Sequence, residues 1–110
     1  MPVVLIARFD GDVGKLKEAY DRGHAEIMRR GGAVRFGELR HHCATSRDAL
    51  YIIGVWDSEE HARSRWASED FRSLLTSFGF PSTPTEMTIL DLHAIEPPLP
   101  AGAPPPTQSR

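Results

Sequence analysis

Two spacings of hydrophobic residues alternate along the chain, and their order predicts its secondary structure. Short runs dense in β-branched and aromatic residues predict buried strands, whereas apolar residues that recur every three or four positions predict amphipathic helices. Strands are predicted over residues 3–9, 33–42, 50–56 and 86–95. One helix is predicted over residues 13–30 with Asp12 as its cap, and a second from Asp57 or Ser58 to about Ser77.

The resulting order, β-α-β-β-α-β, is typical of an α+β, ferredoxin-like fold, in which one antiparallel sheet carries both helices on one face. The strands are apolar on both faces. In the first strand, alternate residues from Val3 to Phe9 form one apolar face, and Val4 and Ile6 lie on the other. A single chain would leave one of these faces in water. We therefore expect a homodimer that packs sheet face against sheet face, the arrangement of a dimeric α/β barrel.

Composition places the chain among folded single-domain proteins. Its 110 residues are 40% hydrophobic and 25% charged, which is sufficient for one hydrophobic core. We expect residues 1–96 to form the domain. Six of the ten residues that follow Glu96 are proline, so residues 97–110 are expected to form a Pro-rich, disordered tail.

Charge and residue content narrow the expected partners and location. A formal net charge of −2 provides no basic field for nucleic acid. The longest apolar run, residues 3–7, is far shorter than the roughly 20 residues needed to span a bilayer, and no charged segment precedes it as in a signal peptide. The single cysteine, Cys43, cannot form an internal disulfide. We expect a cytoplasmic protein that binds neither nucleic acid nor membrane.

Two segments carry a resemblance to a known family. The segment YIIGVWDSEEHA at residues 51–62 and the segment WASEDF at residues 66–71 resemble the antibiotic biosynthesis monooxygenase group of dimeric α/β-barrel proteins. That group typically shows a strand ending in an aromatic residue, then Trp-x-Ser-x-Glu-x-Ala, then a helix with Ser-x-x-Phe. His42 and the Gly-Phe-Pro break at residues 79–81 are similar to features of short actinobacterial members without a known function.

The resemblance implies chemistry on a small molecule, but some of the group's functional residues are missing here. Cofactor-independent monooxygenases of the group use an Asn with Trp, Tyr or Arg around a polyphenolic substrate, and this chain contains no Asn. Haem-degrading relatives bind iron through a His at the position of Leu75. Many relatives carry a His where this chain has Arg65, which is a fixed cation. We therefore expect no haem and no other cofactor.

His24 and His42 are the candidate general bases, because an imidazole titrates near neutral pH. An arginine, Arg65 or Arg8, would hold the anion that forms. A flat aromatic ligand would stack in an apolar cavity between helices and sheet, walled by Tyr20, Trp56, Trp66, Phe71, Leu75 and Phe78. Each of these residues also has a purely structural interpretation. The aromatic residues would pack in the core, His24 would bond to a backbone carbonyl, and Arg8 would form an ion pair with Asp91.

The run His41-His42-Cys43 suggests a metal cluster, but strand geometry argues against one. Successive strand residues point to opposite faces, so His41 and His42 cannot serve the same site. Cys43 shares a face with His41, which leaves a zinc site under-filled unless His93 from the last strand contributes. We expect no metal site.

The function that these observations favour is a cofactor-independent monooxygenase acting on a small aromatic or polyketide-type molecule. Two alternatives stay open: a non-catalytic dimer that binds or senses a small molecule, and an isomerase or cyclase that uses a His base without oxygen. The chain has no phosphate-binding glycine loop, serine-hydrolase elbow or zinc-protease motif. Oxygen consumption would separate the monooxygenase from the isomerase, and binding without turnover would indicate a binding protein.

Overall fold

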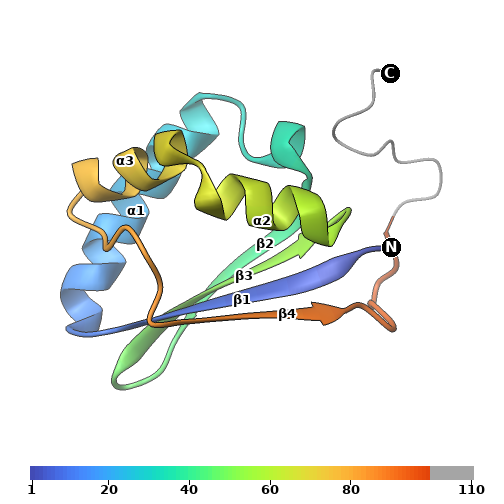
Figure 1. Cartoon of the computed structure of the whole chain (residues 1–110). Helices are drawn as coiled ribbons and strands as arrows, with labels where there is room; N and C mark the ends of the chain where they lie inside the picture. The colour runs from blue at the N-terminus through green and yellow to red at the C-terminus, as the bar shows by residue number, and fades with distance from the viewer. Residues whose placement is uncertain (100–110) are drawn as a thin grey trace.

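The computed structural model describes residues 1–99 (Figure 1), so most of the predicted tail, residues 100–110, lies outside the described residues. The described chain forms, in order, β1 (Val3–Asp10), α1 (Val13–Arg29), the 3-10 helix η1 (Val34–Phe36), β2 (Glu38–Thr45), β3 (Ala49–Trp56), α2 (Glu59–Ala67), α3 (Glu69–Ser77) and β4 (Glu86–Asp91). The predicted order of elements is confirmed, except that α2 and α3 replace the single second helix.

The four strands form one antiparallel sheet in the order β2-β3-β1-β4. Helices α1, α2 and α3 lie together on one face of this sheet (Figure 1). This is the α+β, ferredoxin-like arrangement that the hydrophobic pattern predicts, with the first strand in the interior of the sheet between β3 and β4. On the other sheet face, the described residues place no helix.

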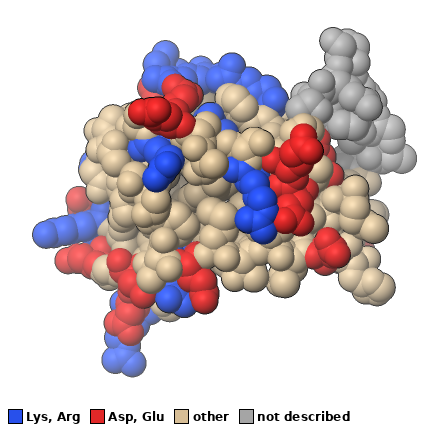
Figure 2. Space-filling view, in the orientation of Figure 1, with Lys and Arg blue, Asp and Glu red and all other residues tan. Residues whose placement is uncertain are grey.

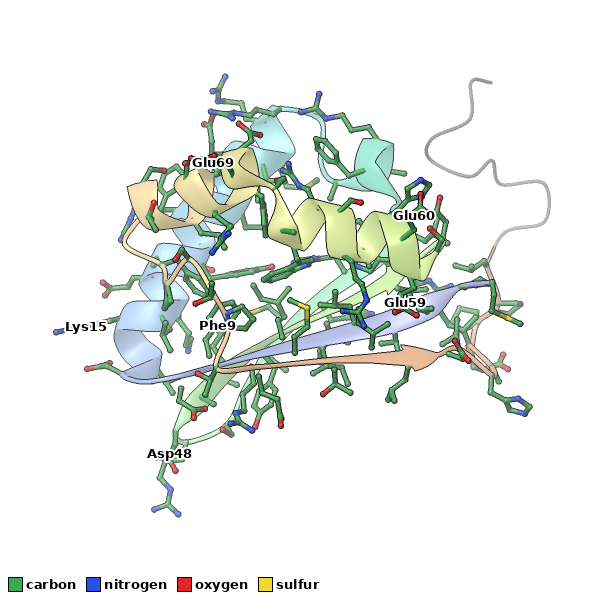
Figure 3. The ribbon with its side chains drawn as sticks, in the orientation of Figure 1. Phe9, Lys15, Asp48, Glu59, Glu60 and Glu69 are labelled. Atoms are coloured by element: carbon green, nitrogen blue, oxygen red, sulfur yellow. The ribbon has the colours of Figure 1, made fainter. Side chains whose placement is uncertain are left out.

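The hydrophobic core lies between the sheet and the helices. Alternate residues of β1 from Val3 to Phe9 face the helices and are at most 2% exposed, whereas the residues between them are partly exposed. The ring centroid of Phe9 lies 4.6 Å from that of Phe80 and 6.1 Å from that of Trp66, and Figure 3 shows Phe9 between the two layers. Aromatic packing of this kind joins the sheet to the C-terminal end of α2 and to the chain just after α3.

The second helical segment is interrupted at Ser68, which corrects the expectation of one continuous helix. Ser68 has φ −69° and ψ 137°, an extended conformation, and its hydroxyl accepts a hydrogen bond from the N–H of Phe71 at 3.1 Å. Ser58 caps α2 in the same way, by accepting from the N–H of His61 at 3.1 Å. Because a serine followed by acidic residues is a strong helix start, α3 begins anew at Glu69.

Strand β2 starts later than predicted and contains a bulge. Residues 34–36 of the strand predicted over residues 33–42 form η1, and β2 begins at Glu38. Glu38 lies opposite Trp56 and Arg40 lies opposite Val55, so one strand carries an extra residue between these pairs. Glu38 therefore shares the helix-facing side of the sheet with Trp56, while Arg40 points to the other side, where its Nη2 donates to the carbonyl oxygen of Pro97 at 2.7 Å.

Arg8 lies on the sheet face turned away from the helices. Its guanidinium pairs with Asp10 at 2.9 Å and with Glu86 at 3.1 Å. The partner expected from the sequence, Asp91, lies opposite Val3, so that ion pair does not form. The antiparallel register of β1 and β4 explains the difference, because it places Arg8 beside the beginning of β4 rather than its end.

Charged side chains of both signs are interspersed on the surface that Figure 2 shows. Some of them form exposed pairs within one helix, such as Arg63 with Glu59 at 2.7 Å. Exposed pairs of this kind contribute about 0–1 kcal/mol each. Among residues 1–99, no helix has the length and apolar character that crossing a membrane requires.

Candidate functional site

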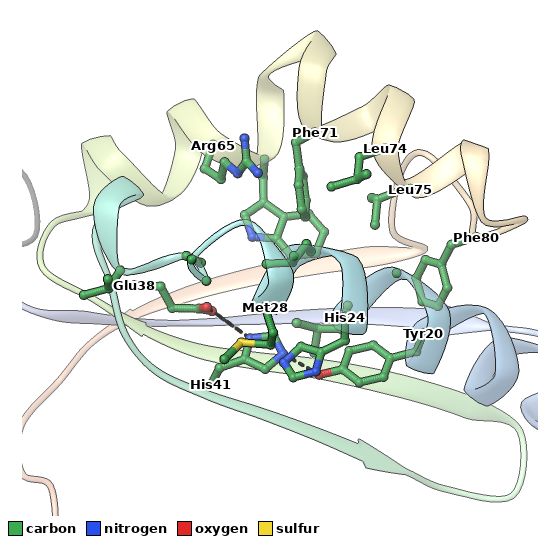
Figure 4. A pocket seen from close by; sticks show the side chains of 18 of the residues that line it. Tyr20, His24, Met28, Glu38, His41, Arg65, Phe71, Leu74, Leu75 and Phe80 are labelled. Atoms are coloured by element: carbon green, nitrogen blue, oxygen red, sulfur yellow. Dashed lines mark hydrogen bonds and ion pairs between the residues drawn. The ribbon is translucent and has the colours of Figure 1, made fainter.

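A cavity of about 290 Å³ lies between the sheet and the helices (Figure 4). Its volume is close to the lower end of the range for small-molecule sites, about 300–1,000 Å³. Most of the side chains that line it are apolar: Ile27, Met28, Trp56, Trp66, Phe71, Leu74, Leu75, Phe78 and Phe80. A few polar side chains also line it, among them Tyr20, His24, Glu38, His41 and Arg65.

The structure brings most of the predicted site residues to this one cavity. They come from α1, β3, α2, α3 and the residue after α3, so the fold assembles side chains that are distant in the sequence. The predicted residues that line the cavity are Tyr20, His24, Trp56, Arg65, Trp66, Phe71, Leu75 and Phe78.

His42 and Arg8 are the predicted site residues that the structure places outside the cavity, and Arg8 is paired with Asp10 and Glu86 instead. His42 pairs with Ile53 on β3, and that pair faces away from the helices, whereas His41 pairs with Gly54 on the cavity side. The expected assignment of His42 to the cavity is therefore corrected to its neighbour. The physical reason is the alternation of side chains along a strand, which allows only one of two adjacent histidines to face the cavity.

A hydrogen-bonded chain of three side chains crosses the floor of the cavity. The Tyr20 hydroxyl lies 2.5 Å from Nε2 of His41, and Nδ1 of His41 lies 3.0 Å from Oε2 of Glu38. The Glu38 side chain is 9% exposed, and its carboxylate accepts a hydrogen bond from Nδ1–H of His41, which leaves Nε2 as the acceptor for the Tyr20 O–H. A carboxylate that orients an imidazole, which in turn faces a hydroxyl, is a common arrangement for moving a proton.

The absence of a side chain at Gly54 leaves the space that the Glu38 carboxylate occupies. A Cβ atom at Gly54 would overlap Oε2 of Glu38 and would lie 2.8 Å from Nε1 of Trp56. Both atoms therefore sit directly over the backbone of β3, at a position where only a residue without a side chain fits. The indole N–H of Trp56 is buried and has no hydrogen-bond partner among the described residues.

Burial keeps the Tyr20 hydroxyl protonated. Desolvation raises its pKa above the ordinary value of 10, and repulsion from the ionised form of Cys43 and from the Glu38 carboxylate raises it further. A phenol in this state keeps its proton at neutral pH and donates a hydrogen bond to Nε2 of His41. Desolvation, followed by the charge of Asp21, also raises the pKa of the Cys43 thiol to about 11, so this thiol stays protonated at neutral pH.

The ring of His24 stacks on the rings of Tyr20 and His41. Its ring centroid lies 5.2 Å from that of Tyr20 and 5.2 Å from that of His41, with interplanar angles of 12° and 15°. Burial lowers the pKa of His24 below 6.5, and the charge of His41 lowers it further. His24 is therefore a neutral imidazole at physiological pH.

We expect the lowered pKa of His24 to make the fold less stable in mild acid. A histidine that prefers to stay neutral in the folded state stabilises the fold above the unfolded pKa of about 6.5, and this contribution is lost as the pH falls below it. His24→Phe keeps a stacked ring without the charge. Melting curves at pH 7.5 and 5 should therefore show a smaller loss of Tm for His24→Phe than for the natural chain. The exposed His93→Phe is the control, and an equal loss in His24→Phe would contradict the expectation.

Arg65 supplies a buried positive charge to the wall of the cavity. Its side chain is 9% exposed, and its guanidinium carbon lies 3.8 Å from the ring centroid of Phe36 and 4.6 Å from that of Phe71. Its carboxylate partner is Asp70, at 3.6 Å, and Asp70 is 82% exposed. Burial lowers the pKa of Arg65 from its ordinary value, but a guanidinium stays charged at neutral pH.

Within residues 1–99, no group of three or more His, Cys, Asp or Glu side chains is arranged to hold a metal ion. His41 and Cys43 share the helix-facing side of β2, whereas His42 lies on the other side. The polar groups of the cavity are instead connected to one another through Tyr20, His41 and Glu38, which suits proton transfer.

Two polar residues of the cavity, Glu38 and His41, were missed by the sequence reasoning. From the sequence alone, Glu38 is assigned no role and His41 is treated only as a possible metal ligand. The bulge between Glu38 and Arg40 separates those two side chains and sets which histidine faces the helices. A usable signal was present in Gly54, since a glycine inside a strand often marks the close approach of another group.

Comparisons with known proteins support the fold. No family model matches the sequence, and a search of curated proteins finds no relative. Among solved structures, SnoaB, a cofactor-independent oxygenase from Streptomyces nogalater, is 20% identical over 87% of this chain and 97% of its own, with a TM-score of 0.59. A proposed antibiotic biosynthesis monooxygenase from Chloroflexus aurantiacus is 17% identical over 86% of this chain and 97% of its own, with a TM-score of 0.56.

The same fold also occurs in proteins of unknown function. The NE2512 protein from Nitrosomonas europaea is 15% identical over 92% of this chain and 96% of its own, with a TM-score of 0.60. The chain thus has the ferredoxin-like fold of the antibiotic biosynthesis monooxygenase and SnoaB-like dimeric α/β-barrel proteins over most of its length. At these identities the likeness establishes the fold alone.

Proposed function

We propose that this protein is a cofactor-independent monooxygenase that oxidises a small aromatic or polyketide-type molecule in the cavity beneath the helices. The observation that carries the proposal is the chain from Tyr20 through His41 to Glu38, which opens into an otherwise mostly apolar cavity. SnoaB, whose fold this chain shares, is described as a cofactor-independent oxygenase. A proton acceptor inside an apolar cavity is the equipment that such chemistry requires from a protein.

In the proposed reaction, the substrate is an anthrone or a quinol, and a proton leaves its acidic C–H or O–H group. Nε2 of His41 accepts this proton, either directly or through Tyr20. In the second route, the Tyr20 oxygen accepts the substrate proton while the Tyr20 hydroxyl gives its own proton to His41. Glu38 stabilises the imidazolium that results, as a buried carboxylate beside a histidine does. The stack of His24 on both rings keeps the acceptor in place.

The substrate anion is the reductant in the oxygen step. For an anthrone, the carbanion gives electrons to dioxygen and a carbon–oxygen bond forms, which yields a hydroperoxide once a proton returns. Loss of water from that hydroperoxide leaves a carbonyl group, so one dioxygen is consumed and one water is released for each CH₂ converted to C=O. His41, carrying the proton that it removed, is placed to return it. The apolar walls exclude bulk water from these intermediates.

Oxygen uptake with a simple anthrone tests this proposal. The purified protein is mixed with dithranol, and both thermal stabilisation and oxygen consumption are recorded against buffer and against heat-denatured protein. We expect a rise in Tm and an oxygen uptake that matches the quinone formed. Stabilisation without oxygen uptake would indicate a binding protein, isomerisation without oxygen would indicate the isomerase alternative, and both outcomes would overturn the monooxygenase proposal.

We also propose that two copies of the chain associate through the sheet face that carries no helix. Apolar side chains of β1, β3 and β4 collect there, and Leu90 is 51% exposed. Several neighbours on this face are only partly buried, among them Val4, Ile6 and Ile53. Covering them with a second sheet would remove this apolar surface from water.

Placing a charge in this face is expected to separate the two copies. Ile53→Asp puts a carboxylate where a partner sheet would bury it, and an unpaired buried charge is strongly unfavourable. Light scattering after size-exclusion chromatography should give the mass of a dimer for the natural chain and of a monomer for Ile53→Asp. Lys17→Glu, on the exposed side of α1, should stay dimeric. A monomeric natural chain would contradict the proposed dimer.

A further inference from the structure

The cavity holds a positive charge that the proton-transfer chain does not use. The Arg65 side chain is only 9% exposed, and its buried Nε atom has no hydrogen-bond partner among residues 1–99. Its carboxylate contact in the described residues, Asp70, is long at 3.6 Å and mostly in solvent. Buried N–H groups of a guanidinium are costly to leave unpaired, so this one is a ready donor for a group that enters the cavity.

A second cation lies close to the same place. The guanidinium carbon of Arg35 is 4.6 Å from the ring centroid of Phe36, the same ring over which Arg65 lies at 3.8 Å. Of the carboxylates near the cavity, Glu38 is already engaged by Nδ1 of His41. Two guanidinium groups thus lie against the ring of Phe36, and the carboxylate that contacts Arg65 is the exposed Asp70.

Arg65 and the proton-transfer chain occupy different walls. In Figure 4 Arg65 projects from α2 above the cavity, beside Phe71, while Tyr20, His24 and His41 lie below. A ligand that fills the apolar space between them can meet a donor at one end and a proton acceptor at the other. A flat ring system carrying one acidic group toward each end fits this arrangement.

We infer that the ligand of this cavity is an aromatic carboxylic acid that also carries a phenolic or enolic hydroxyl, with its carboxylate on Arg65 and its hydroxyl on the Tyr20–His41–Glu38 chain. The inference rests on the proposed function and narrows its substrate class. A carboxylate can accept from the unpartnered Nε and a neighbouring Nη of Arg65, which is the geometry that guanidinium groups recognise best. The apolar walls strengthen this contact, because little water competes for it.

Matched ligands test the inference on the natural chain. Calorimetric titration compares 6-hydroxy-2-naphthoic acid with its carboxamide and with 2-naphthol, which lack the negative charge. We expect the acid to bind at least tenfold more tightly than the carboxamide. In Arg65→Gln this preference should disappear, while the affinity for 2-naphthol changes little. Arg63→Gln removes an exposed arginine from the same helix and should keep the preference.

The possible outcomes separate this inference from the proposed function. Equal binding of acid and carboxamide, or a preference that survives in Arg65→Gln, would overturn the assignment of a carboxylate to Arg65 and leave the oxygenase proposal standing. Failure of dithranol and of all three naphthalenes to bind would instead count against the proposed function. Because the first comparison uses only the natural chain, it holds even where Arg65→Gln lowers the Tm.

Discussion

Replacing His41 with glutamine is expected to slow the proposed oxygen-consuming reaction about 10²- to 10⁴-fold, the usual contribution of a positioned acid–base group. Nε2 of His41 is the acceptor of the Tyr20 proton, and glutamine offers no basic nitrogen in its place. The rate of oxygen uptake with dithranol measures this effect. Affinity for the ligand should change far less than the rate, because the apolar walls stay in place.

The adjacent histidine provides the matched control for this experiment. His42 lies on the opposite face of β2, paired with Ile53, and does not line the cavity. His42→Gln should therefore keep the rate within about twofold, because the sheet separates its side chain from the cavity. A large loss of rate in His42→Gln with a normal His41→Gln would reverse our assignment of the two histidines.

Truncating Phe9 is expected to cause a large loss of stability. Phe9 is 1% exposed and packs edge-on against Phe80 at 4.6 Å, with Trp66 at 6.1 Å. Phe9→Ala leaves a cavity between the sheet and the helices, and changes of this kind cost about 3–5 kcal/mol in the free energy of unfolding. Guanidinium unfolding at a fixed protein concentration measures the loss, because association adds to apparent stability.

Phe9→Leu is the graded control for this prediction. Leucine keeps most of the apolar volume of the ring, so the loss should be clearly smaller than in Phe9→Ala. If Phe9→Ala lowers the free energy of unfolding by less than about 1 kcal/mol, the packing of Phe9 on Phe80 and Trp66 does not hold the sheet and the helices together.

The hydrophobic pattern predicted the fold because the strands and helices of this chain are strongly periodic. The expected caps also form, since Asp12 accepts from the N–H of Lys15 at 3.1 Å and Ser58 caps α2. The break at Ser68 was missed because the apolar spacing continues across it. The capping signal there, a serine followed by two acidic residues, is the same as at Ser58. It starts a new helix because the serine hydroxyl accepts a hydrogen bond from the N–H of Phe71.

The walls of the cavity were easier to predict than its polar chemistry. Aromatic residues such as Trp66 and Phe71 belong to the inner side of a helix whatever the details of the strands. The polar residues of β2 depend instead on register, and a single bulge after Glu38 changes which side chains face inward. Both faces of β2 carry polar residues, so the sequence offered no hydrophobic alternation to set the choice between His41 and His42.

Five histidines make the location of the ligand directly measurable. The chain contains five in all; His24 and His41 line the cavity, and His42, His61 and His93 do not. Imidazole signals in a ¹H–¹⁵N NMR spectrum, assigned with single His→Gln variants, can be followed while dithranol is added without oxygen. We predict shifts at His24 and His41 and none at His42. A ligand that shifts His42 and leaves His41 unchanged would contradict the assignment of the active site to this cavity.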